Sequence, residues 1–153
     1  MKISSQKGSV SIVVGLILLI VIAAIGLTLT ARKDTNKITN KGYTYSVEID
    51  GASSSEKEGV DALTSADKTL VISISPSSTN VSIECKSTRP MVADIVINSV
   101  TYPICKITNP EIYVTSFKSE NQWHTVTVLS PDNKRTITTS EIQNIVRKIS
   151  VNK

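Results

Sequence analysis

The stretch from Val10 to Ala31, VSIVVGLILLIVIAAIGLTLTA, contains 22 residues and no charged side chain. As an α-helix it would extend about 33 Å at about 1.5 Å per residue, enough to cross the roughly 30 Å hydrocarbon core of a bilayer. Its Ile, Val and Leu residues would lie on every side of such a helix, so lipid or other copies of the same helix are the expected surroundings. The sequence therefore predicts a transmembrane helix at residues 10–31.

The flanks of this run leave three interpretations open. A secretory signal peptide has an apolar core of about 7–15 residues with small residues at the cleavage site. The run is longer than that, although Ala24 and Gly26 would offer a cleavage site. The second interpretation is a signal anchor that is never removed. The third depends on Lys7 and Gly8, which stand directly before the apolar run.

A basic residue and a glycine before an apolar helix resemble the prepilin-type, or class III, signal of type IV pilins, archaeal pilins and archaellins. The resemblance covers the first 31 residues. It implies a prepilin peptidase that cuts between Gly8 and Ser9, which removes a leader of residues 1–8 and keeps the stem helix. Ser9 stands where bacterial pilins usually have Phe or Met, and Val13 where they have Glu. These departures favour an archaeal-type pilin or a minor pilin.

The basic excess of the chain lies on both sides of the apolar run. Of the net charge of +4, residues 1–9 carry +2 and residues 32–42 carry +3, whereas residues 43–153 have 11 basic and 12 acidic groups and carry −1. A nucleic-acid-binding domain needs a clustered basic face, so we predict no nucleic-acid partner for the folded part. Because both flanks are positive, the charges do not determine the orientation in the membrane.

Cys85 and Cys105 are the two cysteines of the chain. In a small domain behind an export signal, such a pair is most simply a disulfide, which would stabilise the domain by about 3 kcal/mol and favours an extracytoplasmic location. The alternative is two buried thiols in a cytosolic domain. His124 is the only histidine, and the three residues together fall short of the four ligands of a structural zinc site. We therefore predict no metal site and no cofactor.

We predict a stem helix over 9–41, followed by a globular domain over 42–153. The outer end of the stem, residues 32–41, is polar and a poor helix former by propensity, and it stops at Gly42, which suits a helix C-cap. Residues 51–59 are predicted as a solvated loop and residues 60–66 as a short helical turn. Strict or partial alternation of apolar and polar residues predicts strands at 43–50, 70–75, 81–85, 91–100, 111–117 and 123–129, with a short return strand at 135–138.

The last predicted element is an amphipathic helix. Ser140 and Gln143 fit a capping box, and helical spacing relates the apolar residues that follow, Ile142, Ile145, Val146 and Ile149. This stripe is ordinary for a helix that covers a sheet; binding to a membrane surface or a partner is the alternative. The predicted fold class is a transmembrane helix followed by a mainly antiparallel β domain, α+β and pilin-like, with a C-terminal amphipathic helix.

The sequence contains few candidates for chemistry. A Ser-His-Asp site needs a histidine aligned by an acid, and no second member can be named for His124, so we interpret it as structural or solvent-facing. The acidic cluster Glu56–Glu58 falls in a predicted polar loop. Asn80 begins an Asn-Val-Ser triplet, which is either an N-glycosylation acceptor or an unmodified turn. We predict that the protein is not an enzyme.

These observations predict a structural subunit of a type IV pilus-like surface filament, anchored in the membrane with its β domain outside the cell. Its expected partners are membrane lipid, a prepilin peptidase, and copies of itself or other pilins through residues 9–31. Small residues in the run would allow close approach of helices, namely Gly15, Ala23, Ala24 and Gly26. Adhesion, motility, DNA uptake and secretion are equally compatible roles. The alternative is a single-pass anchored binding or scaffold domain that does not polymerise.

Overall fold

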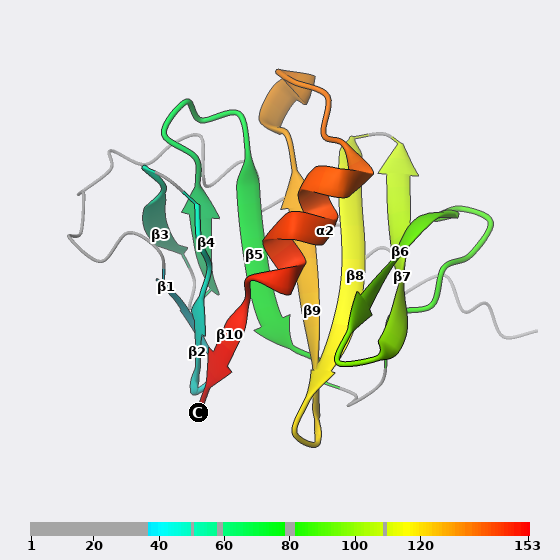
Figure 1. Ribbon diagram of the computed structural model, residues 1–153. Helices are drawn as coiled ribbons and strands as arrows, with labels where there is room; N and C mark the ends of the chain where they lie inside the picture. The colour runs from blue at the N-terminus through cyan, green and yellow to red at the C-terminus, as the bar shows by residue number, and fades with distance from the viewer. Residues whose placement is uncertain (1–36, 50, 58–59, 79–81, 109) are drawn as a thin grey trace, which may run out of the picture.

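The computed structural model describes residues 37–49, 51–57, 60–78, 82–108 and 110–153. Within them the fold consists of two antiparallel sheets, one α-helix and a single 3-10 turn (Figure 1). The elements are β1 Lys37–Asn40, β2 Tyr43–Ser46, β3 Ser53–Lys57, β4 Val60–Thr64, β5 Val71–Pro76, β6 Met91–Ile97, β7 Val100–Thr108, β8 Glu111–Ser119, β9 Gln122–Leu129, η1 Pro131–Asn133, α2 Thr139–Arg147 and β10 Ser150–Asn152.

The larger sheet has seven strands in the order β3-β4-β5-β9-β8-β7-β6. Its centre is the β8–β9 hairpin, and every side chain from Ile112 to Phe117 is buried. Burial on both sides follows from the alternation of β8, because Tyr113 and Phe117 join one hydrophobic cluster while Ile112 and Val114 join the other. The predicted hairpin over 111–129 and the predicted mainly antiparallel β architecture are confirmed.

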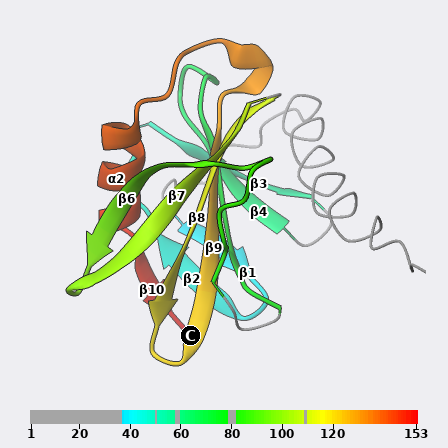
Figure 2. The same ribbon diagram turned by 90° about the vertical axis from the view of Figure 1, so that its right-hand side faces the viewer.

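Helix α2 lies across one face of this sheet, in front of β9 (Figures 1 and 2). Ile142, Ile145 and Val146 are buried beneath it, as the helical spacing predicted. The predicted cap was wrong by two residues. Thr138 is extended and its hydroxyl accepts the Glu141 N–H at 3.2 Å, so Thr138 is the N-cap of the helix rather than Ser140.

A small sheet of three strands, in the order β1-β2-β10, packs beside β4 and β5. The stem helix was predicted to continue through Lys41, and this was wrong for its last residues because β1 and β2 form a hairpin there. Its two-residue turn, Lys41 and Gly42, has φ of 47° and 82°, the geometry of a type I′ turn. Ile38 is fully buried, so the folded domain begins at β1 rather than at residue 42.

Four other predictions for local structure were wrong. The segments 51–59 and 60–66 contain the hairpin of β3 and β4, in which Ser53 pairs with Thr64. No ladder forms in the described residues of 81–85; the nearest pairing is an isolated bridge between Lys86 and Arg89. Residues 135–138 form no strand, although Ile137 in that segment is buried.

The predicted strand over 91–100 is two strands joined by a turn. β6 ends at Ile97, Asn98 and Ser99 form a turn with positive φ, and β7 begins at Val100. The predicted strand at 43–50 corresponds to β2, which begins at the same residue but ends at Ser46, and the one at 70–75 corresponds to β5, which is shifted by one residue. In the part of the chain that the structure describes, no helix is both long and apolar enough to span a membrane.

Candidate functional site: the β6 edge and the disulfide-bonded segment

The predicted disulfide is confirmed. Cys85 and Cys105 are bonded, with their Cα atoms 5.4 Å apart. Cys105 lies in β7 and is fully buried, whereas Cys85 belongs to the irregular segment 82–90 that leads into β6. The bond therefore fastens a segment without ladder hydrogen bonds to a strand of the main sheet.

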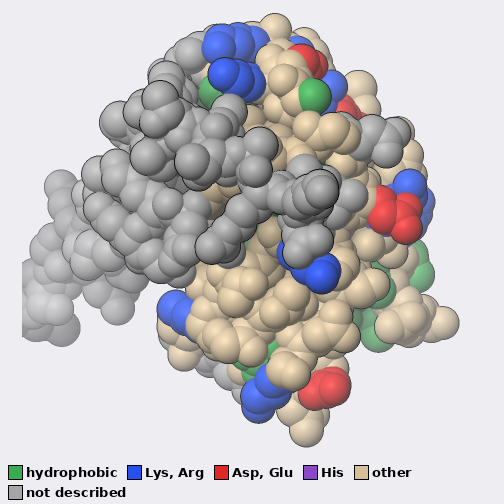
Figure 3. Space-filling view, turned by 90° about the vertical axis from the view of Figure 1, so that its left-hand side faces the viewer, with side chains coloured by type: hydrophobic (Ala, Val, Ile, Leu, Met, Phe, Trp, Pro, Cys, Tyr) green, Lys and Arg blue, Asp and Glu red, His purple; other side chains and the backbone are tan. Residues whose placement is uncertain are grey.

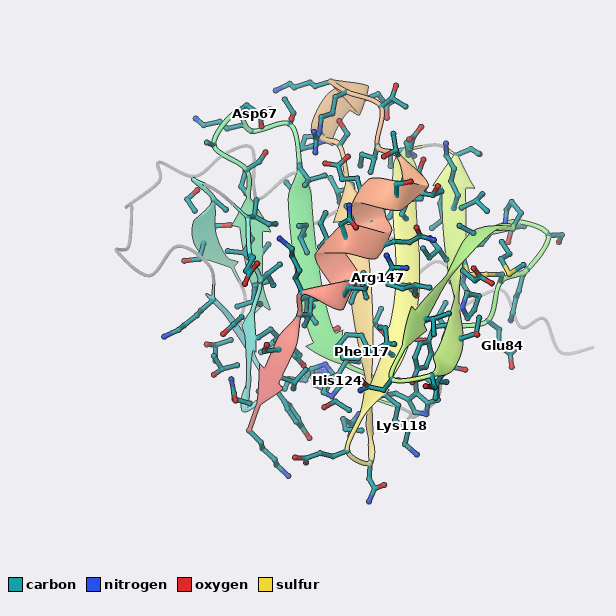
Figure 4. All side chains as sticks on the ribbon, viewed as in Figure 1. Asp67, Glu84, Phe117, Lys118, His124 and Arg147 are labelled. Carbon is teal, nitrogen blue, oxygen red and sulfur yellow. A yellow bond between two sulfur atoms is a disulfide. The ribbon has the colours of Figure 1, made fainter. Side chains whose placement is uncertain are left out.

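Further contacts hold the same segment in place. The Ile83 N–H donates to the hydroxyl of Ser116 in β8 at 2.8 Å. The Arg89 guanidinium donates to the Glu84 carbonyl at 2.6 Å, and beyond it the Lys106 N–H donates to the Pro90 carbonyl at 2.9 Å. Figure 4 shows the disulfide beside Glu84 at the β7 side of the sheet. The start of β6 is thus fixed by covalent and polar contacts.

The strand that follows carries an unusual surface. Among the described residues, the large apolar side chains that are exposed all belong to the β6–β7 hairpin: Met91 at 62%, Val92 at 42%, Val96 at 51% and Val100 at 49%. We call these four residues the β6 patch. Where described residues are visible on the opposite side of the molecule, apolar side chains form only small, separate areas among charged ones (Figure 3). Because Val96 is paired with Thr101 and Val100 with Ile97, Val96 and Val100 lie on opposite faces of the hairpin.

Among the described strands β7 is the only neighbour of β6, which makes β6 an edge strand of the sheet. The Pro103 carbonyl accepts the Thr115 hydroxyl at 2.8 Å, so that residue of β7 faces β8. Backbone groups alternate along an antiparallel strand, so Ile95 bonds to Tyr102 of β7, while Asp94 and Val96 direct their N–H and C=O groups outward. The Asp94 carbonyl accepts the Gln143 side chain of α2 at 2.5 Å. Val96 retains the open backbone groups of this edge.

The surroundings of His124 indicate a structural role for this residue. It is fully buried in β9, and its Nδ1 shares a hydrogen bond of 2.9 Å with the Tyr45 hydroxyl. The rings of Tyr43 and Phe117 lie 5.1 Å and 5.5 Å from the imidazole, and Figure 4 shows Phe117 and His124 next to each other. Burial lowers the pKa of His124. None of these described neighbours is an acid, so the arrangement does not match a Ser-His-Asp site.

An open cavity of about 470 Å³ lies between α2 and the turn that precedes β5. The Asp67 carboxylate accepts the Ser65 hydroxyl, the Thr69 hydroxyl and the Thr69 N–H, and these bonds lower its pKa to about 2. Arg135 pairs with Glu141 at the same cavity. The Glu48 carboxylate pairs with Lys148 at 3.2 Å, so the charged side chains that line the cavity all have partners. The lining residues are Glu48, Ile49, Ser65, Ala66, Asp67, Leu70, Arg135, Glu141 and Ile145.

The remaining predicted sites lie outside the described residues. These are the processing pair Gly8 and Ser9, the glycosylation candidate Asn80 and the predicted span at 10–31. In the described ranges, no group of three or more His, Cys, Asp or Glu side chains is arranged to hold a metal ion. Comparison with known protein families, with curated proteins and with solved structures found no match.

Proposed function

We propose that the protein is a structural subunit of a type IV pilus-like surface filament. Residues 1–8 are the leader, residues 10–31 are the apolar stem, and the disulfide-bonded β domain is carried on the outside. The stem enters the membrane first and then packs against stems of other subunits, because a helix that is apolar on every side can leave lipid only for another apolar surface.

The observation that carries this proposal is the Cys85–Cys105 disulfide in a domain that follows 22 uncharged residues. Disulfides persist in oxidising compartments and are rare in the cytosol. A domain of this kind is therefore expected outside the cytoplasm. The apolar run supplies both the export signal and the attachment that such a location requires.

The short connection between stem and domain supports the same arrangement. Only five residues, 32–36, separate Ala31 from β1. Even a fully extended chain of that length spans no more than about 18 Å. The β domain is therefore held close to the end of the stem, as a subunit that packs around a central bundle of stems requires.

The N-terminus of the native protein tests this proposal. We expect intact mass and N-terminal sequencing to give Ser9 as the first residue, and electron microscopy to show filaments that bind an antibody against the β domain. G8V should block processing and abolish filaments, whereas the matched leader variant S5A should retain both. A native chain that starts at Met1, or one cut near Gly26, would overturn the proposal.

A single-pass anchored binding module is the second candidate, and the open β6 edge favours it specifically. An edge strand with free backbone groups can add an extended segment of another protein as an extra strand. In this case the chain keeps its stem but forms no filament. A chain that retains Met1 and is displayed on the cell as dispersed molecules would support this candidate over the filament subunit.

A further inference from the structure

We propose that the small sheet, β1-β2-β10, is a docking surface for the headgroups of anionic phospholipids. Lys37, Lys41 and the polar outer face of this sheet contact the surface of the bilayer, while the rest of the β domain stays in water. The contact belongs to the stage at which the chain is anchored, and it rests on the proposed attachment by residues 10–31.

The small sheet has one face in the core and one face outside (Figure 1). Ile38 and Tyr45 lie opposite each other in β1 and β2, and both are fully buried. In β10, Val151 pairs with Tyr45 and continues this inner face. Side chains alternate along a strand, so the residues on either side of these three point away from the core. We call the residues that point outward the outer face: Lys37, Thr39, Thr44, Ser46, Ser150 and Asn152.

The chemistry of the outer face suits phosphate groups. Its side chains are hydroxyls, an amide and the Lys37 ammonium group, and exposed Lys41 adds a second ammonium group at the hairpin turn. Within their described residues, β1, β2 and β10 contain no acidic side chain. Glu48 follows β2, but its carboxylate is paired with Lys148 at 3.2 Å. All of these outer groups can donate hydrogen bonds, which phosphate oxygens accept.

The position of the small sheet in the chain identifies the source of the phosphate. The apolar run ends at Ala31 and β1 begins at Lys37, so the connection of five residues spans no more than about 18 Å. Such a tether keeps the outer face close to the headgroups and raises their effective concentration, which makes a weak contact sufficient. A nucleic acid in solution lacks this advantage and requires a larger cluster of basic groups.

The charge of the two lysines determines the expected strength. Near an anionic membrane surface each basic residue contributes about fivefold to the ratio of docked to undocked domains, so Lys37 and Lys41 together contribute about 25-fold. This attraction decays within a Debye length, about 8 Å at physiological ionic strength. Docking therefore depends on anionic lipid and on low to moderate salt.

Fluorescence quenching in vesicles tests the contact with the full chain. Vesicles of phosphatidylcholine and phosphatidylglycerol are compared with vesicles of phosphatidylcholine alone, and both carry a nitroxide quencher on the lipid headgroup. The native cysteines are bonded to each other, so S150C introduces a sole free thiol for a fluorophore on the outer face. The matched label is T101C, which is exposed on β7, three strands away from β5 in the main sheet.

We expect stronger quenching at S150C than at T101C in the anionic vesicles, and a loss of this difference in phosphatidylcholine alone. Raising the ionic strength from about 0.1 M to about 1 M shortens the Debye length from about 10 Å to about 3 Å and should remove the difference as well. Equal quenching of the two labels in anionic vesicles would overturn the contact, as would a difference that persists in phosphatidylcholine.

A pair of charge variants assigns the effect to the small sheet. K37Q/K41Q should lower the ratio of docked to undocked domains about 25-fold, whereas K68Q/K86Q should change it less than about twofold. Both variants remove two exposed lysines and the same net charge, so they are expected to fold. Equal losses in the two variants would contradict the assignment. Binding of free DNA that K37Q/K41Q abolishes would assign the face to nucleic acid and overturn the lipid contact.

The outcomes separate this contact from the proposed function. A chain that floats with the vesicles but shows equal quenching at S150C and T101C is anchored without the contact, which leaves the filament subunit in place. A chain that does not float with the vesicles overturns the anchoring itself. Docking by chains that retain Met1 supports the contact and overturns the filament subunit.

Discussion

Acidification should destabilise the folded domain through His124, in the range from about pH 6.5 to about pH 4.5. The imidazole is fully buried against Tyr45, Tyr43 and Phe117, and none of these groups compensates a positive charge. Lys153 lies over the outer ring, Tyr43, and adds a second positive group to this region. Protonation of the folded state is therefore disfavoured, which agrees with the pKa of His124 being lowered by burial.

The direction and size of the effect follow from proton linkage. An unfolded histidine titrates near pH 6.5, so below that value the unfolded chain binds a proton that the folded domain does not. Stability is fully present above about pH 6.5 and is lost as the pH falls. The loss is up to about 1.4 kcal/mol for each pH unit between the pKa of the unfolded and that of the folded state.

Carboxylates act at the lower end of this range and below it. Hydrogen bonds from Ser65 and Thr69 lower the pKa of Asp67 to about 2. Burial alone would raise the pKa of Glu111, but hydrogen bonds from Lys106 and Tyr113 outweigh burial and lower it. The stability that these two groups contribute is present above the ordinary carboxylate values, near 4, and is lost as the pH falls below them.

Urea unfolding of the full chain in detergent, followed by the fluorescence of Trp123, measures the effect. Trp123 is the only tryptophan and adjoins the histidine in β9. The control is the double variant Y45F/H124F, which removes both hydrogen-bonding partners together and leaves neither one buried and unpaired. We expect the native chain to lose stability between pH 6.5 and 4.5 and the double variant to change by less than about 0.5 kcal/mol. An equal loss in both chains would refute the assignment to His124.

Two further predictions concern the segments that sequence patterns described incompletely. Replacement of both cysteines, C85S/C105S, should lower the free energy of unfolding by about 3 kcal/mol, because the unfolded chain loses a closed loop spanning 20 positions; urea titration under the same conditions measures this, and no change would contradict it. T138A should lower stability by about 1 kcal/mol, because the Glu141 N–H loses its acceptor, whereas S140A should stay within about 0.5 kcal/mol. Thermal unfolding by circular dichroism distinguishes the two caps, and a larger effect of S140A would reverse the assignment.

Alternation of apolar and polar residues predicted the strands in which several apolar side chains enter the core. Tyr45 in β2 and Val47 just after it enter the core at a spacing of two, and β8 and β9 contain similarly strong patterns. β3 was missed because it is a polar edge strand of sequence SSSEK. Its place is set by backbone pairing to β4, which leaves no hydrophobic period in the sequence.

Two other segments were predicted wrongly because each of them buries a single large apolar residue. β1 contributes one large apolar residue, Ile38, to the core. A single apolar position cannot show the periodicity from which strands are predicted. The Lys41-Gly42 turn was the available signal, since glycine accommodates the positive φ of a type I′ hairpin, but the same glycine also suits a helix C-cap. Ile137 is another isolated buried residue, held between η1 and α2 without a strand partner.

The sequence showed the residues of β6, but it did not show whether they are exposed. One side of the predicted strand alternates Val92, Asp94, Val96 and Asn98, and all four are exposed. A side that mixes valine with aspartate is compatible with a covered strand or with an open one. Whether that side is covered depends on which elements pack over it, and whether the strand is an edge depends on the pairing order of strands distant in the chain. Sequence periodicity records which side of a strand is apolar, whereas the number of its neighbours is a property of the whole sheet, so an edge acquires functional meaning only once the topology is known.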